Sequence, residues 1–137
     1  MIQPVFTYCG LLQLKLNESQ KSMLQSIDRR AKDIVCLQHD SDYNVVPIQK
    51  LNRRRACLFV SNVVKGEVCE NFNNYFHVRK CNTRNNGCLV TLPRIRTEYA
   101  RKSVSFMAAY VFNELPITIR KEVLSKNFPK ILSDHFV

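Results

Sequence analysis

The sequence predicts an α+β fold that is mainly helical, and three observations support this prediction. Apolar residues recur every three or four positions over most of residues 1–66, which is the spacing of amphipathic helices. Residues 69–87 are polar and rich in asparagine, and short runs beyond them alternate apolar and polar side chains as strands do. We therefore expect about three helices over residues 1–66, followed by a basic segment over residues 67–137 with a small β-hairpin and a terminal helix.

The first two helices follow from apolar spacing and from one capping pattern. Residues 5–16 place apolar side chains at helical steps, although Gly10 weakens this helix locally. Asn17 and Gln20 have the spacing of an N-cap residue and its capping-box partner, so a second helix is expected to begin after Asn17. Its charged face should be the one that meets solvent. Its apolar residues are Met23, Leu24, Ile27, Ala31, Ile34 and Val35.

The third helix is expected to begin at Pro47 and to end at Gly66. A proline suits the first turn of a helix because its missing N–H would have no helical partner there. Arg53, Arg54 and Arg55 fall in the middle of this helix, where three successive residues fan out over nearly a full turn. They therefore cannot all face one ligand. A solvent-exposed side of the helix is at least as good an interpretation of the three arginines as a phosphate-binding site.

The second half of the chain predicts shorter elements. An Asn-Asn-Gly turn signal at residues 85–87 precedes a short strand at residues 88–92. Residues 103–106 alternate polar and apolar side chains, which predicts a second strand. A short helix is expected over residues 108–115. Ser125 has the character of an N-cap for the terminal helix.

The positive charge is concentrated in the second half of the chain. The whole chain has a formal net charge of +10 and a pI near 9.6. Residues 1–45 contain five Lys and Arg and five Asp and Glu, whereas residues 46–137 contain sixteen against six. A positive electrostatic field attracts polyanions. Charge alone therefore favours a nucleic-acid partner over a merely solvated basic face.

The densest basic stretch covers residues 79–102, where seven cations stand against the single acid Glu98. Asparagine, threonine and tyrosine side chains are interleaved with these cations. Cations neutralise phosphates, and polar side chains add shorter-range contacts to phosphate and sugar. The mixture suits binding to a nucleic-acid backbone, and it contains no motif that recognises bases.

The six cysteines do not have the spacing of a metal site. Cys36 and His39 are separated by two residues, but zinc sites usually pair their ligands as Cys-x-x-Cys, which does not occur here. A second group consists of Cys69, His77, Cys81 and Cys88, and its spacing matches no pattern of zinc ligands. We therefore expect ordinary buried or idle thiols, with no metal and no cofactor.

No set of residues in the sequence suits catalysis. Two-metal chemistry needs converging carboxylates, and a nucleophilic site needs a serine or cysteine beside a base. The acidic residues are few and scattered. The only close pair, Asp40 and Asp42, is better explained as residues that stabilise a turn or cap a helix. Glycine-rich phosphate loops are excluded because the chain contains only three glycines.

The sequence predicts neither a secretory signal nor a membrane span. No basic region precedes the first apolar stretch. That stretch, residues 5–16, is well short of the roughly 20 apolar residues that a spanning helix needs. The cysteines are then expected to be free thiols of an intracellular protein, in the nucleus or cytoplasm.

A series of short motifs runs through residues 84–132. They are Arg84-Asn85, Leu92-Pro93, Arg96-Thr97-Glu98, Arg101-Lys102-Ser103, Phe112-Asn113-Glu114-Leu115-Pro116, Ile119-Arg120 and Phe128. In order and spacing they resemble the C-terminal motif of non-LTR (LINE-like, jockey-type) retrotransposon reverse transcriptases. Residues 23–35 and 47–59 resemble, more weakly, the helices that follow the palm of these enzymes.

The resemblance implies a C-terminal fragment of an RNA-directed DNA polymerase without its catalytic centre. The family's catalytic carboxylates lie in an aromatic-x-Asp-Asp motif, and no Asp-Asp pair occurs in this chain. Phe112 also stands where the family usually has tryptophan. The three helices would correspond to the thumb side of the polymerase, and the rest of a longer polymerase would be one partner. The basic tail would hold template RNA or an RNA–DNA hybrid through Arg84, Arg94, Arg96, Arg101 and Lys102.

Two other hypotheses remain open. The amphipathic helices, together with Phe112, Leu115 and Phe128, could form a docking surface for another protein. The chain could also be an inert transposon relic that does not fold alone. Reversing the charge of the basic tail separates nucleic-acid binding from protein docking, and the cooperativity of thermal unfolding addresses the relic.

Overall fold

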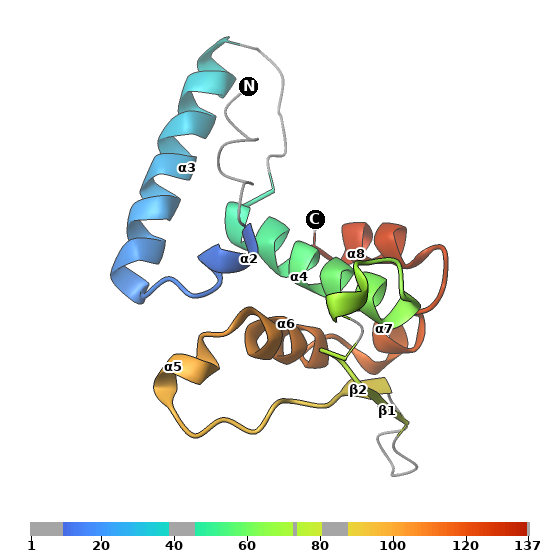
Figure 1. Cartoon of the computed structure of the whole chain (residues 1–137). Helices are drawn as coiled ribbons and strands as arrows, with labels where there is room; N and C mark the ends of the chain where they lie inside the picture. Colours follow the sequence, from blue (N-terminus) through green and yellow to red (C-terminus); the bar gives the residue numbers. More distant parts are fainter. Residues whose placement is uncertain (1–9, 39–45, 73, 81–87, 137) are drawn as a thin grey trace.

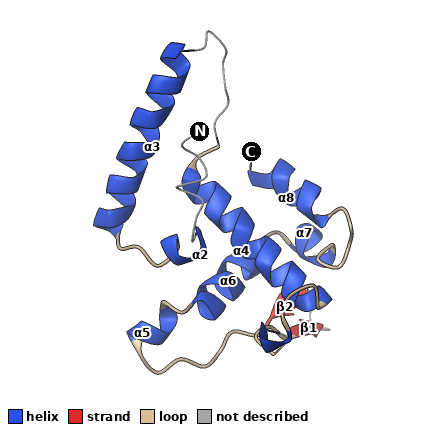
Figure 2. Ribbon diagram, turned by 45° about the horizontal axis from the view of Figure 1, so that its top comes forward, coloured by secondary structure: helices blue, strands red, loops and turns tan. Residues whose placement is uncertain are grey.

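The computed structural model of the chain describes residues 10–38, 46–72, 74–80 and 88–136. Within these ranges the fold is mainly helical, with a small antiparallel hairpin and a terminal helix, which confirms the predicted fold class (Figures 1 and 2). None of the described helices combines the length and the apolar character that crossing a bilayer requires. The elements are α2 (Gly10–Gln13), α3 (Glu18–Gln38), α4 (Ile48–Lys65), a 3-10 turn η1 (Glu70–Phe72), β1 (Val78–Lys80), β2 (Cys88–Val90), α5 (Glu98–Arg101), α6 (Val104–Asn113), α7 (Ile117–Lys121) and α8 (Phe128–Phe136).

The start of α3 has the predicted capping box. The backbone N–H of Gln20 donates to Asn17 Oδ1 at 2.8 Å, and the N–H of Asn17 donates to Gln20 Oε1 at 3.1 Å. These reciprocal bonds satisfy amide groups that a helix start otherwise leaves unpaired. The preceding helix is shorter than predicted, because α2 ends at Gln13, and residues 5–9 of the predicted helix lie outside the described residues.

α3 projects away from the helices around α4 (Figure 1), and three of its apolar side chains are exposed. The exposed fractions are 65% for Met23, 48% for Ile27 and 52% for Ile34. On the charged face, Asp28 and Lys32 form an ion pair at 3.0 Å with side chains only 21% and 26% exposed. Periodicity identifies a helix and its faces but not what covers them. Solvent therefore meets the apolar stripe as well as the charged face, where Arg29 is exposed and Asp28 and Lys32 are partly exposed.

α4 is the central helix, and small residues allow its neighbours to approach closely. Ala56 and Cys57 are fully buried on its inner face. α6 packs against this face most extensively, and α2 and α8 also contact α4. The Ser61 hydroxyl is buried and donates to the Val123 carbonyl at 2.8 Å, which ties α4 to the chain after α7.

Both ends of α4 lie close to their predicted positions. Pro47 directly precedes the helix, so α4 begins one residue later than expected. Gly66 has φ of 74°, a left-handed conformation that glycine adopts without strain and that ends helices. The N–H of Glu67 then donates back to the Asn62 carbonyl at 2.9 Å, which confirms Gly66 as the C-terminal stop.

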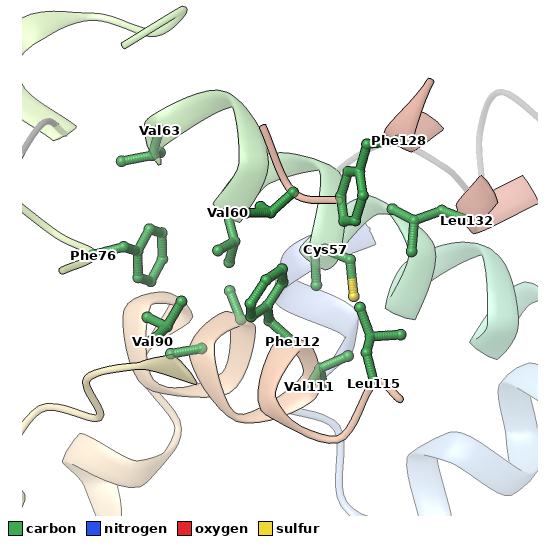
Figure 3. Close-up of a cluster of buried hydrophobic side chains, with 14 residues drawn as sticks. Cys57, Val60, Val63, Phe76, Val90, Val111, Phe112, Leu115, Phe128 and Leu132 are labelled. Atoms are coloured by element: carbon green, nitrogen blue, oxygen red, sulfur yellow. The ribbon is translucent and has the colours of Figure 1, made fainter. Parts of the chain in front are cut away.

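One hydrophobic core joins the two halves of the chain (Figure 3). Phe112, Leu115 and Phe128 lie within it, with exposed fractions of 0%, 4% and 0%. The prediction that these three side chains form a docking surface is therefore wrong, because they fill the interior. The buried cluster consists of Ala56, Cys57, Val60, Val63, Phe76, Val90, Ala108, Ala109, Val111, Phe112, Leu115, Val123, Phe128 and Leu132.

The hairpin exists, but its partner strand differs from the prediction. β2 lies within the predicted strand of residues 88–92, and it pairs antiparallel with β1, with Val78 opposite Val90. The turn signal at residues 85–87 falls outside the described residues. Residues 103–106 do not form a strand, because Ser103 caps α6 and accepts a hydrogen bond from the Phe106 N–H at 3.3 Å.

The last two predicted helices also differ from the prediction at their starts. α6 begins at Val104, four residues before the predicted helix, since the Ser103 cap sets its start. α8 begins at Phe128, so Ser125 is not its N-cap. The Ser125 hydroxyl instead accepts a bond from the Asn127 N–H at 3.2 Å within the preceding turn.

Asn113 clamps the hairpin to the end of α6. The Val90 N–H donates to Asn113 Oδ1 at 2.9 Å, and Asn113 Nδ2 donates to the Val90 carbonyl at 2.8 Å. The Thr91 N–H bonds to the His77 carbonyl across the hairpin. Because residues of an antiparallel pair alternate in the direction of their backbone groups, those of Val90 face away from β1. The Asn113 amide therefore occupies the place of a third strand at the outer edge of β2.

Replacing Asn113 by alanine should destabilise the fold by about 2 kcal/mol, because two hydrogen bonds of roughly 1 kcal/mol each are lost. Denaturant unfolding measures this change. Asn62→Ala is the matched control, since Asn62 is exposed on α4, and it should change stability by less than about 0.5 kcal/mol. Equal stability of the two variants would contradict the clamp.

Candidate nucleic-acid interface

Four of the five residues predicted to contact nucleic acid lie on one continuous stretch of the surface. Arg94 and Arg96 belong to an extended connection, residues 91–96, that leads from β2 to α5 (Figure 1). Arg101 ends α5, and Lys102 follows it. All four are exposed. The fifth, Arg84, lies outside the described residues.

Two capping residues turn the chain at this stretch. Thr97 caps α5, and its Oγ1 accepts a bond from the Ala100 N–H at 3.2 Å. Ser103 caps α6 six residues later. Threonine and serine favour this position because their oxygens satisfy an unpaired amide of the first turn. The caps thus place Arg101 and Lys102 at the corner between two short helices.

The cations of this stretch are mostly unpaired. Arg101 lies 3.7 Å from the Glu98 carboxylate, but both side chains are largely exposed, at 64% and 74%, so the pair holds Arg101 weakly. Across the part of the chain that is described, Arg94, Arg96 and Lys102 have no carboxylate within 4.0 Å. These cations are therefore available to phosphate groups.

Other cations of the second half are less available. Arg53 forms an ion pair with Glu114, which links α4 to the end of α6. Arg54 and Arg55 are partly buried, and Arg55 has a partner of its own. Arg120 is only 7% exposed. The three arginines of α4 therefore do not form a free phosphate-binding site, in keeping with the expectation that three successive helical residues cannot all face one ligand.

A hollow of about 290 Å³ opens beside Arg101 and Lys102. The α2–α3 connection, α5 and α6 line it, so it joins segments that are far apart in the sequence. Its wall is mainly apolar, with cations among its lining residues. The lining residues are Leu14, Lys15, Leu16, Glu98, Arg101, Lys102, Phe106, Met107 and Tyr110.

Among the cations that line this hollow, Lys15 is the one that the sequence did not predict as a binding residue; the sequence did not single out Tyr110 either. Lys15 is placed there because α2 packs tightly on α4. A Cβ atom on Gly10 would lie 2.5 Å from Asn52 Oδ1, so only glycine fits without movement. Asn52 Nδ2 also donates to Gln13 Oε1 at 2.7 Å. Only the close approach at Gly10 could have signalled this arrangement, and in the sequence Gly10 suggests only a weak helix.

The described residues contain no metal centre. No group of three His, Cys, Asp or Glu side chains in the described ranges lies close enough together to hold an ion. Of the residues considered as zinc ligands, Cys69 is exposed, and Cys88 lies in β2, opposite Lys80 of β1. His39 and Cys81, like the acidic pair of residues 40 and 42, fall outside the described residues.

Cys57 is a packing residue. Burial raises the pKa of its thiol from 9.0 to about 12, while Arg53 lowers the pKa and Glu114 raises it to smaller extents. Because the thiolate is the reactive form of cysteine, such a thiol is inert near neutral pH. The buried sulfur lies in the core between α4 and α6 (Figure 3).

Comparisons with known proteins do not add to this description. No protein-family model, curated protein or solved structure matches the chain. What bears on function is the geometry of the exposed cations and the hollow, together with the motifs of residues 84–132.

Iodoacetamide should alkylate Cys69 in the folded protein and leave Cys57 unmodified near neutral pH. Cys69 is exposed, whereas the Cys57 thiol is buried and protonated. Peptide mapping by mass spectrometry distinguishes the two sites. Both should react once the chain is unfolded in denaturant, and rapid modification of Cys57 in the native protein would show that the core around α4 is open.

Proposed function

We propose that this chain binds RNA or an RNA–DNA hybrid and catalyses no reaction. The observation that carries the proposal is the row of exposed cations at Arg94, Arg96, Arg101 and Lys102, three of which have no described ionic partner. When surface cations of a protein neutralise phosphates, the counterions condensed on the nucleic acid are released. This release drives binding to the nucleic-acid backbone.

The motif resemblance supports the same proposal and identifies the setting. Residues 84–132 resemble the C-terminal end of LINE-like reverse transcriptases, and several of their motif residues build the platform that carries the cations. Thr97 and Ser103 cap helices, and Asn113 clamps the hairpin. In this proposal the chain acts in the nucleus or cytoplasm, as the non-catalytic C-terminal part of an RNA-directed DNA polymerase. The absence of an Asp-Asp pair supports the lack of polymerase activity.

A second candidate function is docking to another protein, and one observation favours it. Met23, Ile27 and Ile34 form an exposed apolar stripe on α3. Under the resemblance, the partner of this stripe is the remainder of a longer polymerase. The two functions are compatible because they use different surfaces. An inert relic would lack cooperative thermal unfolding, whereas a core shared by both halves of the chain favours a cooperative transition.

The binding test compares two triple variants with the same change in net charge. Arg94→Gln, Arg96→Gln and Lys102→Gln together should weaken binding of single-stranded RNA by roughly tenfold at about 50 mM salt. Three lost phosphate contacts should also reduce the salt slope of binding by about 2, at about 0.7 per contact. Fluorescence anisotropy of a labelled RNA measures both quantities.

The control carries Lys121→Gln, Lys126→Gln and Lys130→Gln, which neutralise exposed lysines near α7 and α8. It should bind RNA nearly as tightly as the unmodified chain. An equal loss in both variants would mean that only net charge matters. No binding by the unmodified chain at low salt would end the proposal.

A further inference from the structure

We propose that the hollow beside α5 accepts one unpaired base, so that the interface prefers single-stranded nucleic acid to a duplex. This inference rests on the proposed nucleic-acid binding and specifies its ligand, because it favours single-stranded RNA over the base-paired RNA–DNA hybrid. It follows from the composition of the wall, the charge of the rim and the size of the hollow.

The wall offers an apolar surface with an aromatic component. Phe106 and Tyr110 lie one turn apart on α6, with ring planes 18° from parallel and centroids 6.2 Å apart. Leu14 from the α2–α3 connection and Met107 from α6 add aliphatic surface to the hollow. Tyr110 remains 46% exposed. A nucleobase has two apolar faces, and contact with an aromatic ring is the usual way in which proteins hold single strands.

The rim offers positive charge for the phosphates that flank such a base. Lys15, Arg101 and Lys102 stand among the lining residues, and Glu98 is the acid that faces them. Glu98 engages Arg101 only at 3.7 Å, which leaves the rim with an excess of cations. Arg94 and Arg96, which do not line the hollow, extend the positive charge along the connection from β2. An apolar hollow beside a cationic track is complementary to a base beside its own backbone.

The size of the hollow favours a single base. Small-molecule sites generally span about 300–1,000 Å³, and this hollow, at about 290 Å³, lies at the lower limit. Bases inside a duplex are stacked and paired, so they cannot enter without unpairing. Single strands present unstacked bases that proteins can bind directly. The hollow should therefore add affinity for single strands and none for duplexes.

The test uses the full chain and three labelled RNAs of about ten nucleotides: a single strand, its duplex, and the same strand with abasic positions. The unmodified chain should bind the single strand roughly tenfold more tightly than the other two, because one stacked base contributes about that factor. Tyr110→Ala should remove this preference and leave duplex affinity unchanged. Tyr110→Phe should retain it.

Tyr75→Ala is the matched control, because Tyr75 is 48% exposed and packs on other aromatic rings away from the hollow. It should keep the full preference, and circular dichroism checks that each variant is folded. Binding of all three RNAs with equal affinity, or an equal loss in Tyr110→Ala and Tyr75→Ala, would overturn the inference while the proposed function stands. Failure to bind any RNA at low salt would overturn both. Binding of poly-glutamate with the same dependence on Tyr110 would overturn base recognition.

Discussion

The close packing of α6 against α4 is the contact on which the rest of the structure depends. Ala56 on α4 and Ala108 and Ala109 on α6 are fully buried, and such small side chains let two helices approach closely. Phe112 and Leu115 then extend from the end of α6 into the space between α4 and α8 (Figure 3). Because Asn113 follows Phe112 directly, the same packing fixes the amide that holds β2. The connection that carries Arg94 and Arg96 starts from this held strand.

The motif residues of the second half act mainly on the backbone. Thr97 and Ser103 satisfy amides at helix starts, Asn113 satisfies a strand edge, and Pro116 directly precedes α7. These roles explain why such residue types recur at fixed spacing, since each corresponds to one turn or one contact. The cations between them need only be exposed on a correctly folded chain. In this account the motif determines the shape of the surface, and the arginines and lysines give it its charge.

Local chemistry made part of the structure predictable. The capping box at Asn17, the stop at Gly66 and the strand at Cys88 depend on neighbouring residues, and each was confirmed. The strand predicted over residues 103–106 is wrong because four alternating residues also fit the first turn of a helix with a serine cap. The hollow was not predictable, since Lys15 approaches Lys102 only through the packing of α2 on α4. The exposure of α3 likewise depends on its position relative to the core, which apolar spacing does not encode.

The central claim is that one surface, the connection after β2 together with α5 and the hollow, contacts nucleic acid. An NMR titration of the isotope-labelled chain with single-stranded RNA tests it most directly, because every backbone amide reports its own environment. The account predicts that shifted amides concentrate in residues 91–110 and around Lys15, while those in the middle of α3 and in α8 stay unchanged. Shifts centred on α3 or α8, or spread evenly over all exposed lysines and arginines, would contradict it.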